Sequence, residues 1–153
     1  MIRHYATETE IEIEIERIGL GVLDRTLPKA EWTHAAHFAC VLWLLRRRPE
    51  PPAEAAMPPM IRAYNEATGV RNTDTEGYHE TITLASIAAA RAVLGSRPPR
   101  EPLHEVAAWL LAGPLGRSDW PLAYWSKARL FSTEARRGWL DPDLQPFDPS
   151  VFG

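Results

Sequence analysis

The sequence predicts an all-α protein: a four-helix bundle with additional short C-terminal helices and an extended, proline-containing tail. Two observations predict this class. Apolar residues recur at the helical period along most of the chain, and no strand-like alternation persists once a longer window is considered. At 153 residues the chain is expected to be a single domain, 1–153, with a frayed start over residues 1–7.

The first helix is predicted over about residues 8–26. Its segment Ile-Glu-Ile-Glu-Ile-Glu alternates as a strand would, but the longer window favours a helix. One helical face collects Ile11, Ile15, Ile18 and Val22. Thr7 and Glu10 have the spacing of a capping box at its start. Gly19 and Gly21 weaken the helix, each by roughly 1 kcal/mol relative to alanine.

A second helix is expected to begin near Pro28, which suits a first helical turn, and to end at about Arg48, before Pro49. Its buried face is predicted to hold Ala30, His34, Phe38, Val41 and Leu45, with Cys40 pointing roughly the opposite way. Residues 49–59 contain five prolines and are predicted to form a stiff crossover rather than a helix.

Three more helices are predicted over about 59–68, 76–95 and 101–112, with a C-terminal glycine at Gly69 and a polar loop at 70–76. The inner face of the 76–95 helix is predicted to hold His79, Ile82, Thr83, Ser86, Ile87, Ala90 and Leu94.

The C-terminal third is rich in aromatic residues. Short helices are predicted over about 120–131 and 132–138, the latter with Ser132 as N-cap. Residues 141–153 contain three prolines and are predicted to be an extended tail that covers the body of the protein.

Composition excludes several functional classes. The net charge is −3 and the largest basic cluster is the arginine triplet 46–48, which argues against nucleic acid as a partner. The single cysteine, Cys40, permits no internal disulfide and fits a reducing compartment. Residues 1–16 lack a signal-peptide apolar core, and the longest apolar stretch, 35–45, is too short to span a bilayer. We therefore expect a cytoplasmic protein without membrane association.

The reactive side chains concentrate in a His/Glu cluster of Glu31, His34, His37, His79 and Glu80. Helical positions 31, 34 and 37 are about 60° apart per step, so they fan across one side of a helix. The remaining pair opens the 76–95 helix. Inward-facing imidazoles and carboxylates on facing helices are how bundles hold metals, which predicts a site for Zn, Fe, Mn or Ni.

The spacing alone does not decide between a metal and a polar core. His-x-x-His lacks the His-Glu-x-x-His pattern of zinc peptidases, and one Glu-x-x-His copy is short of the two in di-iron bundles. A mononuclear site is therefore favoured. The alternatives are a core of His–Glu hydrogen bonds without metal, and exposure of half of the set.

The leading functional interpretation is a metal-binding bundle. If the protein is an enzyme, we expect metal-assisted hydrolysis or a related acid–base step on a small molecule. His34, His37 and His79 would bind the ion, and Glu80 or Glu31 would be the fourth ligand or general base. Tyr78, Tyr64 and Arg129 are predicted to support the site, either behind the metal ligands or beside the substrate. Thr81 and Thr83 are expected to form hydrogen bonds to the ligand side chains. His4 and His104 are expected at the surface, without a role.

The strings Trp-Thr-His-Ala-Ala-His at 32–37 and Gly-Tyr-His-Glu-Thr-Ile-Thr at 77–83 resemble a group of small uncharacterised bacterial helical proteins. The resemblance covers about residues 26–147, with Tyr64-Asn65 and Arg129-Leu130-Phe131-Ser132 between and after these strings, and implies no activity. At the level of fold alone, the chain also resembles the metal-binding bundles related to the DinB proteins. Those use three histidines at a different spacing, so no ligand is carried over.

A second interpretation is non-catalytic. The bundle would bind an apolar small molecule or a partner chain through its aromatic C-terminal third, with the His/Glu cluster as a polar core. A homo-oligomer is compatible with either interpretation. An open coordination position would favour catalysis, whereas a closed or dry cluster would favour structure or binding.

Overall fold

The computed structural model describes residues 8–153, and every regular element in this range is helical. The longer helices are α1 (Glu8–Leu23), α2 (His34–Arg47), α3 (Ala53–Ala67), α4 (Glu80–Ser96) and α5 (Leu103–Ala112). The short ones are η1 (Lys29–Glu31), η2 (Pro114–Gly116), η3 (Trp120–Ala123), α6 (Lys127–Leu130), α7 (Thr133–Arg137) and η4 (Pro149–Phe152). The all-α class is confirmed for the described residues. The narrower prediction of a four-helix bundle is not confirmed, because four longer helices surround a fifth, α2.

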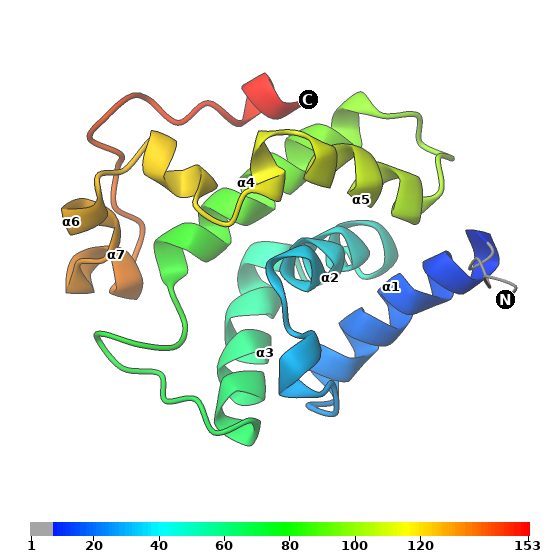
Figure 1. The fold of residues 1–153 in the computed structure, drawn as a ribbon, viewed down its shortest axis with the longest axis horizontal. Helices are drawn as coiled ribbons and strands as arrows, with labels where there is room; N and C mark the ends of the chain where they lie inside the picture. The colour runs from blue at the N-terminus through cyan, green and yellow to red at the C-terminus, as the bar shows by residue number, and fades with distance from the viewer. Residues whose placement is uncertain (1–7) are drawn as a thin grey trace, which may run out of the picture.

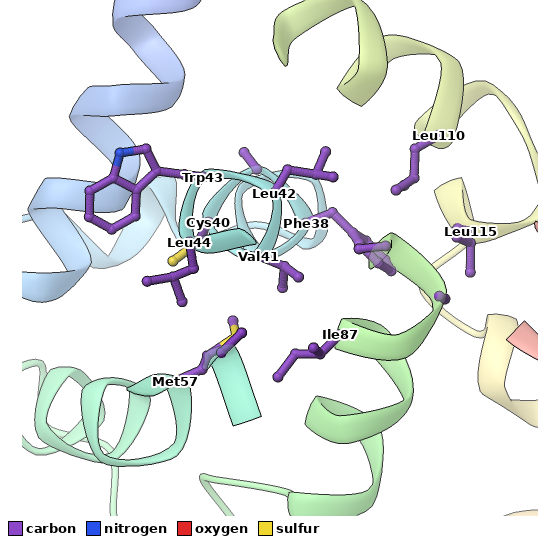
Figure 2. Packing of buried hydrophobic residues seen from close by; sticks show 14 of the residues in the cluster. Phe38, Cys40, Val41, Leu42, Trp43, Leu44, Met57, Ile87, Leu110 and Leu115 are labelled. Atoms are coloured by element: carbon purple, nitrogen blue, oxygen red, sulfur yellow. The ribbon is translucent and has the colours of Figure 1, made fainter. Parts of the chain in front are cut away.

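Helix α2 lies at the centre of the core and contacts α1, α3, α4 and α5 (Figure 1). All seven residues from Phe38 to Leu44 are buried, so this stretch has no solvent face. Figure 2 shows their side chains leaving α2 in different directions, with Trp43 on the side of α1 and Val41 and Leu44 on the side of Met57 of α3 and Ile87 of α4. A helix that is apolar all round is buried on all sides, which explains why the predicted one-sided pattern is wrong for Cys40.

Helix α1 confirms the helical interpretation of the Ile-Glu repeat. Ile15 and Val22 are buried against the core, and Ile18 packs on it, whereas Ile11 is 40% exposed. The helix ends at Leu23, three residues before the expected end. The predicted capping box falls on Thr7, outside the described residues.

Helix α3 corrects the predicted proline crossover. It begins at Ala53 and contains both Pro58 and Pro59, so the crossover spans only the residues between α2 and α3. The prolines remove backbone donors from the helix. Its buried side chains at helical spacing, which are Met57, Met60, Ile61 and Tyr64, bury enough apolar surface to override this local penalty.

Helix α4 begins at Glu80, about four residues later than expected, with His79 as its N-cap. Its far side is covered by α7 and by η4 at the end of the chain (Figure 1). The predicted tail is therefore irregular up to residue 148 and helical in η4. Phe152 is buried and Phe147 packs on the core, whereas Leu144 stays 57% exposed. No helix within residues 8–153 combines the length and the apolar character that crossing a membrane requires.

Candidate functional site

His34 and His37 line a cavity of about 430 Å³ at the N-terminal end of α2. We call it the His37 cavity. Its walls come from the start of α2, one side of α4, the segment around η3 and the end of α6. The lining residues are Trp32, Thr33, His34, His37, Ile82, Ser86, Ser118, Asp119, Trp120, Pro121, Leu122, Leu130 and Phe131. The volume lies within the range of small-molecule sites, which are mostly apolar with a few placed polar groups.

Helix α2 begins at the cavity because Thr33 caps it. The Thr33 hydroxyl oxygen accepts a hydrogen bond from the Ala36 N–H at 3.2 Å, which satisfies one of the free donors of the first turn. The helix was predicted from the sequence to begin near Pro28, which would have put Glu31 on the same helix as the two histidines. The observed start at His34 corrects this prediction. Residues 29–31 instead form the separate turn η1, so the expected fan across one helix does not exist.

His34 is held by a distant backbone group. Its Nε2 atom lies 2.7 Å from the carbonyl oxygen of Leu115 in η2. A carbonyl only accepts, so this nitrogen donates. The ring also lies edge-on to Phe38, with centroids 5.3 Å apart. His34 therefore anchors η2 to the start of α2 from the wall of the cavity.

His37 has no such anchor. Its half-buried ring makes aromatic contacts with Trp32, at 5.4 Å between centroids, and with Phe38, at 6.3 Å. Neither ring nitrogen forms a hydrogen bond with any residue in the described part of the chain. Burial, and secondarily the charge of His34, lower the pKa of His37 to about 4. At neutral pH this ring is uncharged and keeps one donor and one acceptor free.

His79 lies elsewhere, and both of its ring nitrogens are occupied. Nδ1 accepts from the Ile82 N–H at 3.1 Å and thereby caps α4, while Nε2 donates to the Leu130 carbonyl at 2.6 Å. His79 is buried, in line with the expected inner face, but it stands at the N-cap of α4 and not within the helix. Burial lowers the pKa of His79, and the hydrogen bond to Leu130 partly offsets this by raising it.

The predicted carboxylates are also apart from the cavity. Glu31 forms an ion pair with Arg17 of α1, which Glu14 shares. Glu80 accepts a hydrogen bond from the Tyr78 hydroxyl at 2.6 Å. Neither carboxylate lines the His37 cavity.

The predicted supporting residues have structural partners. The Tyr64 hydroxyl donates to the Leu27 carbonyl at 2.8 Å. Tyr78, whose ring lies under the Arg62 guanidinium at 4.4 Å, has a pKa raised by burial and by Glu80. Arg129 donates to the backbone carbonyl of Asp141.

The threonines of α4 were expected to bind ligand side chains. Thr81 instead contacts the carbonyl oxygens of Ala135 and Gly138, at 2.7 and 2.8 Å, and accepts from the Leu140 N–H at 3.1 Å. It therefore fastens α7 and the following chain to α4. His104 was expected at the surface, but its side chain is only 11% exposed and lies 3.5 Å from Glu12.

Within residues 8–153, no three His, Cys, Asp or Glu side chains are arranged to hold a metal ion. Of the residues singled out in the sequence as ligands or bases, only His34 and His37 share a cavity. A metal centre stays a prediction of the sequence.

Sequence reasoning missed Trp32, Ser86, Asp119 and Trp120 as cavity residues. The segment 118–122 is far along the chain from α2, and no local period links the two. The dense aromatics after residue 113 were the available signal, and they favoured an aromatic binding region in the C-terminal third.

Comparison with known proteins places the chain in no family: no family model, no curated protein and no solved structure matches it.

Proposed function

We propose that the protein binds a small aromatic molecule in the His37 cavity. The observation that carries this proposal is the His37 ring itself. It faces a cavity of about 430 Å³ with aromatic walls and has no hydrogen-bond partner among the described residues. Ring nitrogens without a protein partner at a cavity wall are available as one donor and one acceptor to a bound molecule.

The other histidines near the core support the assignment by contrast. His34 and His79 bond to backbone carbonyls of η2 and α6, so they serve the fold. Among the histidines of residues 8–153, only His37 combines access to the cavity with two ring nitrogens that have no hydrogen-bond partner, whereas His34 has only Nδ1 open. The proposal corresponds to the non-catalytic interpretation of the sequence, with the binding region moved to the junction of α2 and the aromatic C-terminal third.

Indole tests the proposal, because it is uncharged, flat and carries one N–H donor. We would titrate isotope-labelled protein with indole and follow the histidine ring signals by NMR. The expected result is a saturable shift at His37 and His34, with no shift at His104. No saturable shift at His37 would refute binding in this cavity.

A matched pair of variants locates the binding. Ser118 lines the cavity and is exposed, so Ser118→Trp places bulk at the rim without disturbing the core. Ala128 is also exposed but lies outside the cavity, so Ala128→Trp is the control. Indole binding should be lost in the first variant and kept in the second. Equal binding by both would place the indole site elsewhere.

A further inference from the structure

The charges around the His37 cavity disfavour an ionic ligand. No lysine or arginine within residues 8–153 lines it, so an anionic group would meet no cation from this part of the chain. The one carboxylate that the described residues place in the wall is that of Asp119, which is 53% exposed and already paired with Arg117, at 3.1 and 3.3 Å from its two oxygens. A cationic ligand would therefore meet a carboxylate whose charge is already compensated by that guanidinium. Neither sign of charge therefore has a free partner in the wall.

The interior of the cavity leads to the same conclusion. Burial keeps the pKa of His37 at about 4, which means that a positive charge on this ring is poorly solvated there. A charged ligand group beside the ring would suffer the same loss of hydration. A neutral group would not, and it could use the open donor and acceptor of the imidazole.

Ser86 adds a second polar contact of defined character. Its hydroxyl donates to the Ile82 carbonyl at 2.7 Å, so only its oxygen lone pairs remain for another partner. Ser86 and His37 both line the cavity, from α4 and α2. Together they offer two acceptors and one donor, which complements a group that both donates and accepts hydrogen bonds.

The walls favour a flat, aromatic body. Trp32, Trp120 and Phe131 line the cavity. Trp32 is held in place edge-on by Tyr64, with ring centroids 5.5 Å apart, and the Tyr64 hydroxyl is itself bonded to backbone. Trp120 packs against Phe38 of α2 at 6.5 Å. Such fixed rings bind planar ligands through stacked and edge-on contacts.

We infer that the ligand of the His37 cavity is an uncharged planar aromatic compound with a group that both donates and accepts hydrogen bonds, such as a carboxamide or an azole. His37 is the residue that selects it over ionic analogues. This inference rests on the proposed function, because it names the ligand class for the same cavity.

Three nearly isosteric probes test the inference: 2-naphthamide, 2-naphthoate and 2-naphthamidinium, which are neutral, anionic and cationic at pH 7.5. Affinities would be measured by the same NMR titration. The amide should bind at least about tenfold more tightly than either ion. Equal or tighter binding of an ion would overturn the inference and leave the proposed function standing. Failure of indole and all three probes to bind would overturn both.

Variants of His37 test its role in selection. His37→Leu should lower the affinity for 2-naphthamide about tenfold, since the hydrogen bonds are lost. His37→Gln keeps one donor and one acceptor and should retain most of the affinity. His104→Gln, outside the cavity, is the control and should bind as wild type. Unchanged amide affinity in a folded His37→Leu protein would refute the role of His37. If that variant fails to fold, the selectivity of the wild-type protein among the three probes still decides the ligand class.

Discussion

The Nε2 atom of His79 lies 2.6 Å from the carbonyl oxygen of Leu130 and joins the start of α4 to the end of α6, 51 residues later in the chain. Because the carbonyl can only accept, Nε2 carries the proton. Nδ1 of the neutral ring is then the acceptor that caps α4 through the Ile82 N–H. One uncharged tautomer thus performs two structural tasks.

Substitution of His79 should separate these two tasks. His79→Ala loses the cap and leaves the Leu130 carbonyl without its donor, so the free energy of unfolding should fall by about 2–3 kcal/mol. His79→Asn restores a good N-cap and should lose about half as much. Urea unfolding of the three proteins measures the difference. Wild-type stability in the alanine variant would contradict this account of the ring.

Stability should fall on mild acidification because of His37 and His79. Both have a folded-state pKa below the unfolded value near 6.5, His37 at about 4, so the unfolded chain binds protons first. Their contribution is complete above pH 6.5, decreases as the pH falls from 6.5 toward the folded-state values, and is gone below them. The slope is at most about 1.4 kcal/mol per pH unit for each proton.

Urea unfolding between pH 7.5 and 5 measures this dependence. His37 faces His34 and, in the same cavity, Asp119, while Arg136 acts on His79. His37→Leu should flatten the profile in this range. A wild-type profile that is level from pH 7.5 to 5 would count against both lowered pKa values.

Two helical glycines should respond to alanine in opposite directions. A Cβ at Gly19 would lie 2.3 Å from the Trp43 ring, so Gly19→Ala forces α1 away from α2. Gly95 in α4 has no atom within 4 Å of such a Cβ. Gly95→Ala should therefore gain up to about 1 kcal/mol from helix propensity, while Gly19→Ala should lose about 1–3 kcal/mol despite the same propensity gain.

Thermal or urea unfolding of both glycine variants measures these shifts. From the sequence alone, Gly19 is expected only to weaken the helix. A stabilised Gly19→Ala protein would show that this simpler view was sufficient and that Trp43 can move.

The sequence carried the fold class because the helical period is a local signal. Ile15, Ile18 and Val22 align at that period, and α1 is a helix as predicted. Helix boundaries that depend on tertiary packing were harder to predict from the sequence. The prolines of α3 looked like a helix stop, but burial of the Met57 side of the helix outweighs their local cost.

The candidate site was only partly predictable for the same reason. The sequence singled out His34 and His37, which do line one cavity. It could not reveal that the partners of His34 and His79 are backbone carbonyls 81 and 51 residues away. Every residue has a backbone carbonyl, so the sequence does not show which carbonyl a histidine will bind. From the side chains alone, a metal ion was the simplest partner that all the histidines could share.

The hydrogen bond of His34 to Leu115 and a metal bound by His34 predict different responses to a chelator. Loss of this ring leaves the Leu115 carbonyl without its donor, so His34→Ala should lower the free energy of unfolding by about 1–3 kcal/mol. If the ring serves only this bond, a chelator should leave the melting temperature of wild-type protein unchanged.

Thermal melts of wild type and His34→Ala, each with and without EDTA, test this expectation. A bound metal would stabilise the folded state by mass action, so EDTA would lower the wild-type melting temperature and affect the variant less. That result would support the metal centre predicted from the sequence and contradict the hydrogen-bond account. Metal analysis of untagged protein by mass spectrometry covers the case of an ion that exchanges too slowly for EDTA to remove. A stoichiometric metal that is lost in His34→Ala and kept in His104→Ala would make His34 a ligand, whereas its absence from wild type would leave the bond to Leu115 as the role of this ring.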